Sequence, residues 1–176
     1  MKILIAYSSA NGTTAKCADM LAEKLKAKNE VSLVNVKDVI PAPEGFDAVI
    51  LGSSVRMSKI SKKIKEYIYQ NIEALNKTLC GVFICCGLPE EFESYAKEQL
   101  PKGFEPSLRT AYFGGELKPK CAKGFDKFIL KAMRRAITQH DFEDGNFEGV
   151  LPEILPESIS NFADIVNMKL YEKNNE

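Results

Sequence analysis

The fold is decided by the stretch Ser8-Ser9-Ala10-Asn11-Gly12-Thr13-Thr14. It follows a short apolar run, Lys2–Tyr7, which predicts a buried strand, and it leads into Thr13–Ala27, where apolar residues recur at helical spacing. The start of a helix offers unpaired N–H groups and a partial positive charge, and both favour a bound phosphate. The hydroxyls of the stretch add hydrogen-bond donors, and Gly12 lets the backbone close on an anion. We therefore expect a phosphate site held by dipoles alone, because the stretch contains no Lys or Arg.

Three other classes of phosphate-handling loop lack their signatures here. A Walker loop needs Gly-x4-Gly-Lys-Ser/Thr, and the Lys is absent; a dinucleotide fingerprint needs three glycines, and only Gly12 is present. A phospho-acceptor receiver domain would place carboxylates after its first and third strands, where this chain has Tyr7-Ser8-Ser9 and Gly52-Ser53-Ser54. The plain alternative to a phosphate site is a helix start with incidental hydroxyls.

Apolar runs alternate with amphipathic segments along the rest of the chain. The expected strands that follow the first are Val31–Val36, Phe46–Leu51, Leu79–Cys86 and Leu108–Phe113. The expected helices that follow the first are Lys59–Leu75, Glu90–Leu100 and Ser158–Tyr171. Such alternation is typical of βαβ crossovers, and near-continuous apolar strands indicate a parallel sheet with both faces covered. We therefore expect a doubly wound α/β protein with a five-stranded parallel sheet, forming one domain over residues 1–176.

An insertion at about residues 118–157 separates the last expected strand from the last helix. Its first part, Pro119–Gln139, has the spacing of an amphipathic helix with several basic residues, and the remainder is acidic and contains several Gly and Pro. Two roles for this helix stay open. It covers the edge of the sheet, or it touches a membrane surface or an anionic partner.

The bulk composition excludes several classes of protein. Lys plus Arg and Asp plus Glu are both 24, so no overall charge favours nucleic acid. No apolar stretch approaches the roughly 18 residues of a spanning helix, and Ile3–Tyr7 is too short for a signal-peptide core. The 5 cysteines are odd in number and show no CxxC spacing, which favours reduced thiols over disulfides or a metal site. We expect packing roles for Cys85 and Cys86, no metal, and a cytoplasmic protein; peripheral contact with the membrane through the 119–139 helix stays an open alternative.

The phosphate loop belongs to a longer pattern, Ile5-x-Tyr7-x-Ser9-x2-Gly12-x-Thr14-x3-Ala18-x2-Leu21. This pattern resembles the FMN-phosphate signature of flavodoxins, with Ala6 as the one departure. The resemblance implies a flavodoxin-like sheet of strand order 2-1-3-4-5, FMN as the cofactor, and flavin contacts in the loops after strands three and four. The FMN-binding residues that it predicts are Ser9, Ala10, Asn11, Gly12, Thr13, Thr14, Ser53, Ser54, Val55, Arg56, Cys86, Gly87 and Leu88. No catalytic residue is predicted.

The predicted flavin-ring loops depart from common flavodoxins. Flavodoxins usually stack aromatic side chains on the ring, whereas this chain has no Trp, which leaves Met57, Phe92 or Tyr95 to cover a ring face. One-electron flavodoxins commonly use a Gly after strand three for a peptide flip, and there is none from Ser53 to Ser61. Arg56 either places a positive charge beside the ring, which makes the flavin potential less negative, or is a solvated base that flanks the next helix.

A second resemblance extends in order over nearly the whole chain. The segments that carry it are Gly52-Ser53-Ser54-Val55-Arg56, Phe113-Gly114-Gly115-Glu116-Leu117 and Gly124-Phe125-Asp126-Lys127-Phe128-Ile129-x-Lys131. They are similar to segments of the menaquinone-dependent protoporphyrinogen dehydrogenases, a flavodoxin-derived family. This resemblance implies an oxidoreductase whose FMN passes electrons from a porphyrinogen-like substrate to a quinone. Two alternatives stay open: a soluble FMN electron carrier that meets a redox partner protein, and a flavodoxin-like module that has lost its flavin.

Overall fold

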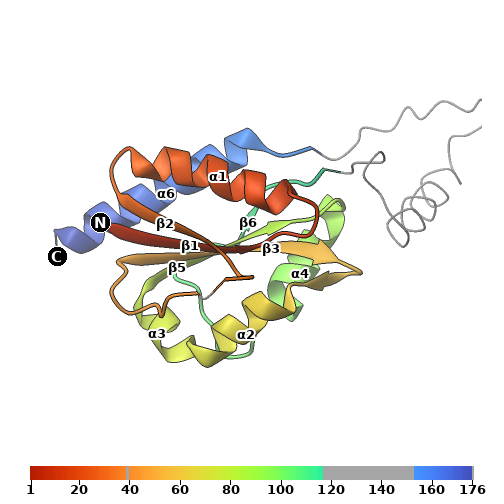
Figure 1. Cartoon of the computed structure of the whole chain (residues 1–176), viewed down its shortest axis with the longest axis horizontal. Helices are drawn as coiled ribbons and strands as arrows, with labels where there is room; N and C mark the ends of the chain where they lie inside the picture. Colours follow the sequence, from red (N-terminus) through yellow and green to blue (C-terminus); the bar gives the residue numbers. More distant parts are fainter. Residues whose placement is uncertain (39, 117–152, 176) are drawn as a thin grey trace, which may run out of the picture.

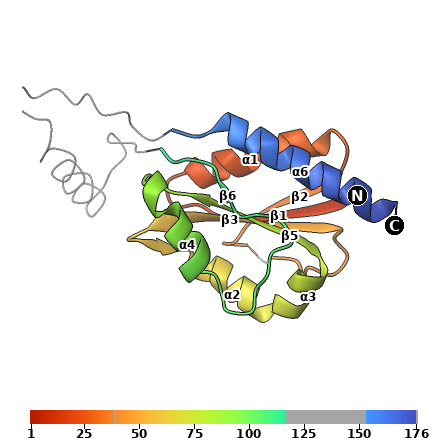
Figure 2. The ribbon, with the colours of Figure 1, turned by 180° about the vertical axis from the view of Figure 1, so that it is seen from behind.

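The computed structural model describes residues 1–38, 40–116 and 153–175. Within these residues, one sheet contains the strands β1 (Lys2–Ser8), β2 (Glu30–Asn35), β3 (Ala48–Arg56), β4 (Lys59–Ile60), β5 (Leu79–Cys85) and β6 (Ala111–Tyr112). The helices are α1 (Thr13–Lys26), α2 (Lys62–Gln70), α3 (Ile72–Lys77), α4 (Phe92–Glu98) and α6 (Pro156–Asn174), with a short 3₁₀ turn at Pro89–Glu91. Helices α1 and α6 cover one face of the sheet, and α2, α3 and α4 cover the other (Figures 1 and 2).

The strand order confirms the predicted topology. The order along the sheet is β2-β1-β3-β5-β6, and all of these neighbours are parallel. The short β4 pairs with β3 in the antiparallel sense and stands outside this path. Without β4, the order is the predicted 2-1-3-4-5 of a doubly wound sheet. The carboxyl ends of β1, β3 and β5 therefore meet at one edge, where such sheets bind their ligands.

Both faces of the central strands are buried, which explains their near-continuous apolar sequences. In β1, Ile3 and Ile5 pack toward α1 and α6, whereas Leu4 and Ala6 pack toward α2 and α3. These residues and their neighbours in β3 and β5 are fully buried. The sheet therefore separates two apolar layers and offers a rigid frame for the loops at its edge.

The third strand ends later than the sequence predicts. We expected it to stop at Leu51, with Gly52-Ser53-Ser54 as a turn leading into a helix, and this expectation is wrong. The strand continues to Arg56 because Ser53 and Ser54 keep the parallel register with Ile84 and Cys85 in β5. The chain then folds back as β4, so the start of the expected helix Lys59–Leu75 is a strand.

The expected helix Lys59–Leu75 is also divided between α2 and α3. The division falls at Asn71, whose backbone leaves the helical region at φ −125°. Its side-chain amide donates to the Tyr67 carbonyl at 2.9 Å, and its backbone N–H donates to the same carbonyl at 3.2 Å. A polar side chain that can bond the preceding turn ends the helix where hydrophobic spacing alone does not.

The expected fifth strand is shorter than predicted, since only Ala111–Tyr112 pairs as a strand. The flanking residues still follow β5, because the Leu108 N–H donates to the Cys80 carbonyl at 2.8 Å and the Phe113 N–H to the Ile84 carbonyl at 3.1 Å. The predicted helix over 119–139, and nearly all of the insertion at 118–157, lie outside the described residues.

A close approach beside β3 requires a glycine. The Phe83 ring of β5 stacks on Phe113, with ring centroids 4.6 Å apart and planes inclined by 17°. A Cβ atom on Gly52 would run into the Phe83 ring itself. Gly52 therefore lets the stacked pair fill the layer beneath α1 and α6.

We predict that Gly52→Ala lowers the free energy of unfolding by about 1–3 kcal/mol, because the added methyl overpacks a fully buried ring. Urea unfolding followed by circular dichroism measures the change. In a Phe83→Leu background the same substitution should cost clearly less, since the ring that it meets is gone. An equal cost in both backgrounds would contradict the assignment.

Candidate functional site

The loop between β1 and α1 is shaped by Gly12. Its backbone is left-handed, with φ 88°, and its N–H donates to the Ser9 hydroxyl at 3.1 Å. The Gly12 carbonyl accepts the Lys16 N–H at 2.9 Å, which starts the helix. The capping position supplies no side-chain hydrogen bond, and the first turn of α1 contains no acidic residue. The start of α1 therefore keeps N–H groups and a positive dipole end for an external anion.

Two buried hydroxyls lie at the same helix start. Thr13 is 8% exposed and Thr14 is 1% exposed. Neither side-chain oxygen has a hydrogen-bond partner among the described residues. A buried polar group without a partner costs about 1–3 kcal/mol, so such groups mark places where a ligand supplies the missing acceptor. The hydroxyls and the helix start together fit the phosphate that the sequence predicts.

A cavity of about 120 Å³ opens over this helix start. It is bordered by the loop before α1, the end of β3, the loop after β5 and the residues after β6. Its lining contains most of the residues predicted from the sequence, namely Ala10, Asn11, Thr13, Thr14, Ser54, Val55, Arg56, Cys86 and Gly87. It also contains Cys85, Gly115 and Glu116, which the prediction did not include. Residues from four separate segments thus converge where the sheet topology places a ligand.

A larger hollow of about 450 Å³ borders the loop on the β3–β4 side. Its lining begins at Ser8, Ser9 and Ala10, passes Ser54 and Arg56, and continues to Met57, Lys59 and Lys62. Ser9, Ala10, Ser54 and Arg56 thus lie where the phosphate loop meets the β3–β4 hairpin.

Three predicted residues do not face either hollow with their side chains. Ser53 is fully buried, and its hydroxyl accepts the Ser61 N–H at 2.9 Å and donates to the Ser54 carbonyl at 3.1 Å. The Leu88 carbonyl accepts a hydrogen bond from the Cys86 thiol at 3.4 Å. Gly12 acts through its backbone alone. Ser53 therefore holds the hairpin to the start of α2 and leaves ligand contact to Ser54 and Arg56.

The hairpin between β3 and β4 is tight and strained. Val55 pairs with Ile60 and Arg56 with Lys59, which leaves Met57 and Ser58 as a two-residue turn. Both turn residues have positive φ, 51° and 55°. Two-residue hairpin turns require this conformation, but it costs a residue other than Gly roughly 1–2 kcal/mol.

Gln99 offsets this strain from the end of α4. Its amide nitrogen donates to the Ser58 carbonyl at 2.7 Å, and its amide oxygen accepts the Ile60 N–H at 3.0 Å. One side chain thus satisfies both sides of the turn. The absence of a Gly between Ser53 and Ser61 is compatible with the turn because this clamp supports it.

Of the side chains considered as covers for a ring, only Met57 remains open to the site. Tyr95 is 4% exposed and belongs to the core beneath α2 and α4. The Phe92 ring packs against Tyr112, with centroids 5.4 Å apart. Met57 is 60% exposed and lines the larger hollow.

The loop after β5 is fixed by the segment that follows β6. The Cys86 N–H donates to the Gly114 carbonyl at 3.1 Å, and the Tyr112 hydroxyl donates to the Cys86 carbonyl at 3.1 Å. A Cβ atom on Gly115 would approach the Cys86 carbonyl oxygen to 2.5 Å, so only a glycine permits this packing. The same arrangement brings Glu116 to the cavity.

Glu116 lines this cavity, although it is not among the site residues predicted from the sequence. Its carboxylate lies 3.3 Å from the Lys16 ammonium of α1, and the two side chains are 22% and 58% exposed. The pair joins the end of the described β6 segment to the second turn of α1. The signal in the sequence was the segment Phe113-Gly114-Gly115-Glu116-Leu117, which carries the second resemblance but from which no site residue was predicted.

The four cysteines that the structure describes are free and buried, which agrees with the predicted packing role of Cys85 and Cys86. Burial raises the pKa of the Cys80 thiol to about 12 and that of the Cys86 thiol to about 11. The pKa of Cys85 is also raised, first by its hydrogen bond with Cys17 and then by burial. The thiols of Cys80, Cys85 and Cys86 are therefore protonated at neutral pH.

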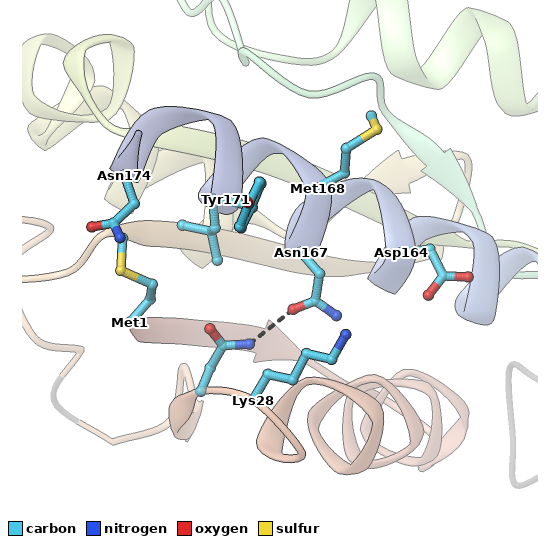
Figure 3. Close-up of a pocket in the computed structure, with 9 residues that line it drawn as sticks. Met1, Lys28, Asp164, Asn167, Met168, Tyr171 and Asn174 are labelled. Atoms are coloured by element: carbon cyan, nitrogen blue, oxygen red, sulfur yellow. Dashed lines mark hydrogen bonds between the residues drawn. The ribbon is translucent and has the colours of Figure 1, made fainter. Parts of the chain in front are cut away.

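Another hollow, of about 420 Å³, lies at the opposite end of the sheet, between the end of α1 and α6 (Figure 3). Met1, Lys28, Asn167 and Tyr171 line it, and the Asn29 amide donates to the Asn167 side chain at 2.9 Å. It adjoins the amino end of β1, where doubly wound sheets do not place their ligands.

In the described ranges, no group of three or more metal-ligating side chains occurs, and no helix is long and apolar enough to span a bilayer.

We predict that Gln99→Ala speeds hydrogen exchange at the Ile60 amide by about five- to tenfold, since one net hydrogen bond of about 1 kcal/mol is lost. Amide exchange followed by NMR measures it. Gln99→Glu is the matched control, because it keeps the oxygen that accepts the Ile60 N–H. Equal exchange rates in the two variants would show that Gln99 does not hold the turn.

Comparison with known proteins agrees with this geometry. A family model described as flavodoxin domain matches residues 4–144. The chain is 26% identical over 144 residues to the Escherichia coli protein named protoporphyrinogen IX dehydrogenase [quinone], a match that covers 77% of this chain and 80% of that protein.

Two solved structures share the fold. The flavodiiron core of a Synechocystis protein superposes with a TM-score of 0.55 at 18% identity, covering 96% of this chain and 36% of the other. A flavo di-iron protein of Thermotoga maritima gives a TM-score of 0.52 at 15% identity, covering 96% of this chain and 35% of the other. Since the family model spans well over half of the chain, the chain belongs to the flavodoxin domain family, and FMN is its cofactor.

Proposed function

We propose that this chain holds FMN at the carboxyl ends of β1, β3 and β5 and acts as an oxidoreductase that passes electrons from a reduced organic substrate to a quinone. The observation that carries the proposal is the pair of buried, unpartnered hydroxyls of Thr13 and Thr14 at the start of α1. When bound, FMN accepts two electrons from a donor and releases them to an acceptor. The protein supplies binding, position and charge.

In this proposal the phosphate is held by the start of α1. The Thr13 and Thr14 hydroxyls and the N–H groups after Gly12 donate to its oxygens, and Asn11 borders the same cavity. Glu116 also lines this cavity, and its pairing with Lys16 at 3.3 Å offsets the carboxylate charge near the anion. The group is thus held by dipoles and hydroxyls, as the sequence predicts.

The flavin ring is assigned to the space between the β3–β4 hairpin and the loop after β5. Ser54, Val55 and Arg56 border it from one side, and Cys86 and Gly87 border it from the other. Met57 is the exposed apolar side chain available to cover a face. The cation of Arg56 favours negative charge on a neighbouring group. Ser9, Ser53 and Leu88 support the loops through their own hydrogen bonds.

The reaction class is supported by the curated relative, whose name gives protoporphyrinogen IX as the donor and a quinone as the acceptor. The match covers 77% of this chain, although at 26% identity. A soluble FMN electron carrier is the second candidate. It is favoured by the exposure of the hairpin, where Met57 is 60% exposed and Arg56 and Lys59 are exposed beside the site.

We predict that Thr13→Val and Thr14→Val each weaken FMN binding by about tenfold or more, because each removes a hydroxyl that donates to a charged oxygen. Quenching of FMN fluorescence measures the affinity. The free energy of unfolding without FMN should stay the same or rise, since valine has the shape of threonine and no unpartnered hydroxyl.

The matched control is Thr78→Val, at the far end of α3. Its hydroxyl donates to the Ala74 carbonyl at 2.8 Å, so this variant should lose stability and keep its FMN affinity. Unchanged FMN affinity in both Thr13→Val and Thr14→Val would refute the phosphate site.

For the reaction, the FMN-loaded protein is mixed anaerobically with protoporphyrinogen IX and a soluble menaquinone analogue. We expect protoporphyrin to accumulate over many turnovers only when both the protein and the quinone are present. Its absorbance and fluorescence measure the product. Failure to oxidise the porphyrinogen, with rapid electron exchange with a redox protein, would favour the carrier instead.

A further inference from the structure

The β3–β4 hairpin and the outer side of α2 form one continuous basic surface. The hollow of about 450 Å³ beside the phosphate loop reaches Lys59 and Lys62. A second hollow of about 520 Å³ begins at the same Lys62 and continues past Lys65 and Tyr69 to Lys102. We call Arg56, Lys59, Lys62, Lys65, Tyr69 and Lys102 the basic surface. It runs from the loop assigned to the cofactor to the far side of α2.

The charge of this surface departs from that of the chain as a whole. Between Arg56 and Glu66 the sequence has five basic residues and one acidic residue, whereas the whole chain has 24 of each sign. Glu66 is the one acid that lines the two hollows, and its carboxylate lies 3.2 Å from the Lys62 ammonium. Lys63 points away, since its ammonium donates to the Val36 carbonyl at 3.1 Å. An excess of positive charge therefore remains over both hollows.

We propose that the basic surface docks an acidic electron-transfer protein, an inference that rests on the second candidate function above, in which the FMN-loaded chain exchanges electrons with a redox protein. Complementary charge attracts such a partner and orients it during approach. The hollows accept projecting carboxylate side chains, and Tyr69, 76% exposed, and Met57, 60% exposed, add apolar contact area. Docking there brings the partner against the hairpin that borders the assigned flavin site.

The same surface suits a lipid bilayer poorly. A helix that lies in a membrane interface buries an apolar face in the lipid. Helix α2 has already buried its apolar face against the sheet, through Ile64, Tyr67 and Ile68. Its outer side presents Tyr69 among charged and polar side chains. An acidic protein is the occupant that both the charge and the hollowed shape favour.

The probe is a plant-type ferredoxin, a small acidic iron–sulfur protein, titrated into the full chain with and without FMN. We expect saturable binding that weakens steeply as salt rises, and carbodiimide cross-links from ferredoxin carboxylates to Lys62 or Lys65. The double variant Lys62→Glu/Lys65→Glu should lose about tenfold or more in affinity at low salt. Calorimetry or microscale thermophoresis measures binding, and mass spectrometry of the peptides locates the cross-links.

The matched control is Lys24→Glu/Lys28→Glu, which changes the net charge equally at the opposite end of the sheet, where Lys28 lines the hollow of Figure 3. It should bind ferredoxin within about twofold of the original chain. Equal losses in both double variants, or no loss in either, would overturn the proposal. The proposal would also be overturned if the chain binds vesicles of anionic lipid through Lys62 and Lys65 and does not bind ferredoxin. That result would favour a membrane as the partner of the basic surface.

The FMN affinity of each variant separates this inference from the proposed function. Neither lysine pair touches the cavity over α1, so FMN affinity should be unchanged in both double variants. If the original chain binds FMN but does not bind ferredoxin, the docking surface alone is rejected. If the original chain does not bind FMN at all, the proposed function is rejected. The titration of ferredoxin into the flavin-free chain still tests the docking surface in that case.

Discussion

The start of α1 sets the constraint on which the rest of the site depends. Two buried threonine hydroxyls and a helix dipole end meet in one cavity without a partner among the described residues. Each unpartnered hydroxyl costs about 1–3 kcal/mol, and the fold accepts this cost at the edge where three parallel strands deliver their loops. In the function that we propose, a phosphate relieves it. Binding energy is then gained from groups that are already in place, which limits the entropy lost on binding.

On the β3–β4 side of the site, backbone strain in the turn is balanced by hydrogen bonds from Gln99. The β3–β4 turn holds two residues at positive φ, and Gln99 supports them with two hydrogen bonds from α4. Strain and support come from separate segments of the chain. The hairpin therefore stays fixed in spite of its exposure, so that Arg56 and Lys59 keep a constant relation to the cavity. A constant relation is what both cofactor binding and partner recognition require.

Much of this architecture could be predicted from local sequence. The loop from Ser8 to Thr14 has the composition of a phosphate site, and the alternation of apolar strands and helices predicts the parallel sheet. The strand order followed from the resemblance to flavodoxins. The continuation of β3 to Arg56 could not be predicted in the same way, because Gly52-Ser53-Ser54 has the composition of a turn. Pairing with β5 overrides that local preference, since the register of Ser53 and Ser54 places them against Ile84 and Cys85.

The roles of Ser53 and Glu116 depend on contacts that no local pattern encodes. Ser53 lies at a predicted site position, but its hydroxyl is occupied by Ser61 and Ser54 within the hairpin. Glu116 lies beside Thr13 and Thr14 only because Gly115 packs on the Cys86 carbonyl, a contact between segments far apart in the chain. Reasoning from the sequence finds residues whose role depends on their neighbours in the chain. It misses residues whose position depends on tertiary packing.

The junction at Gly114 and Gly115 has a wider consequence. The Gly115 N–H donates to the Glu153 carbonyl at 3.1 Å, and Gly114 bridges to Ile154. The two ends of the stretch between them are thus fastened together beside the cofactor loop, independently of what the stretch contains. The pairing of these two ends depends on backbone groups alone, so the sequence between them can change without changing the pairing. The cavity lining supplied by Gly115 is thereby tied to the start of α6, at the opposite end of the chain.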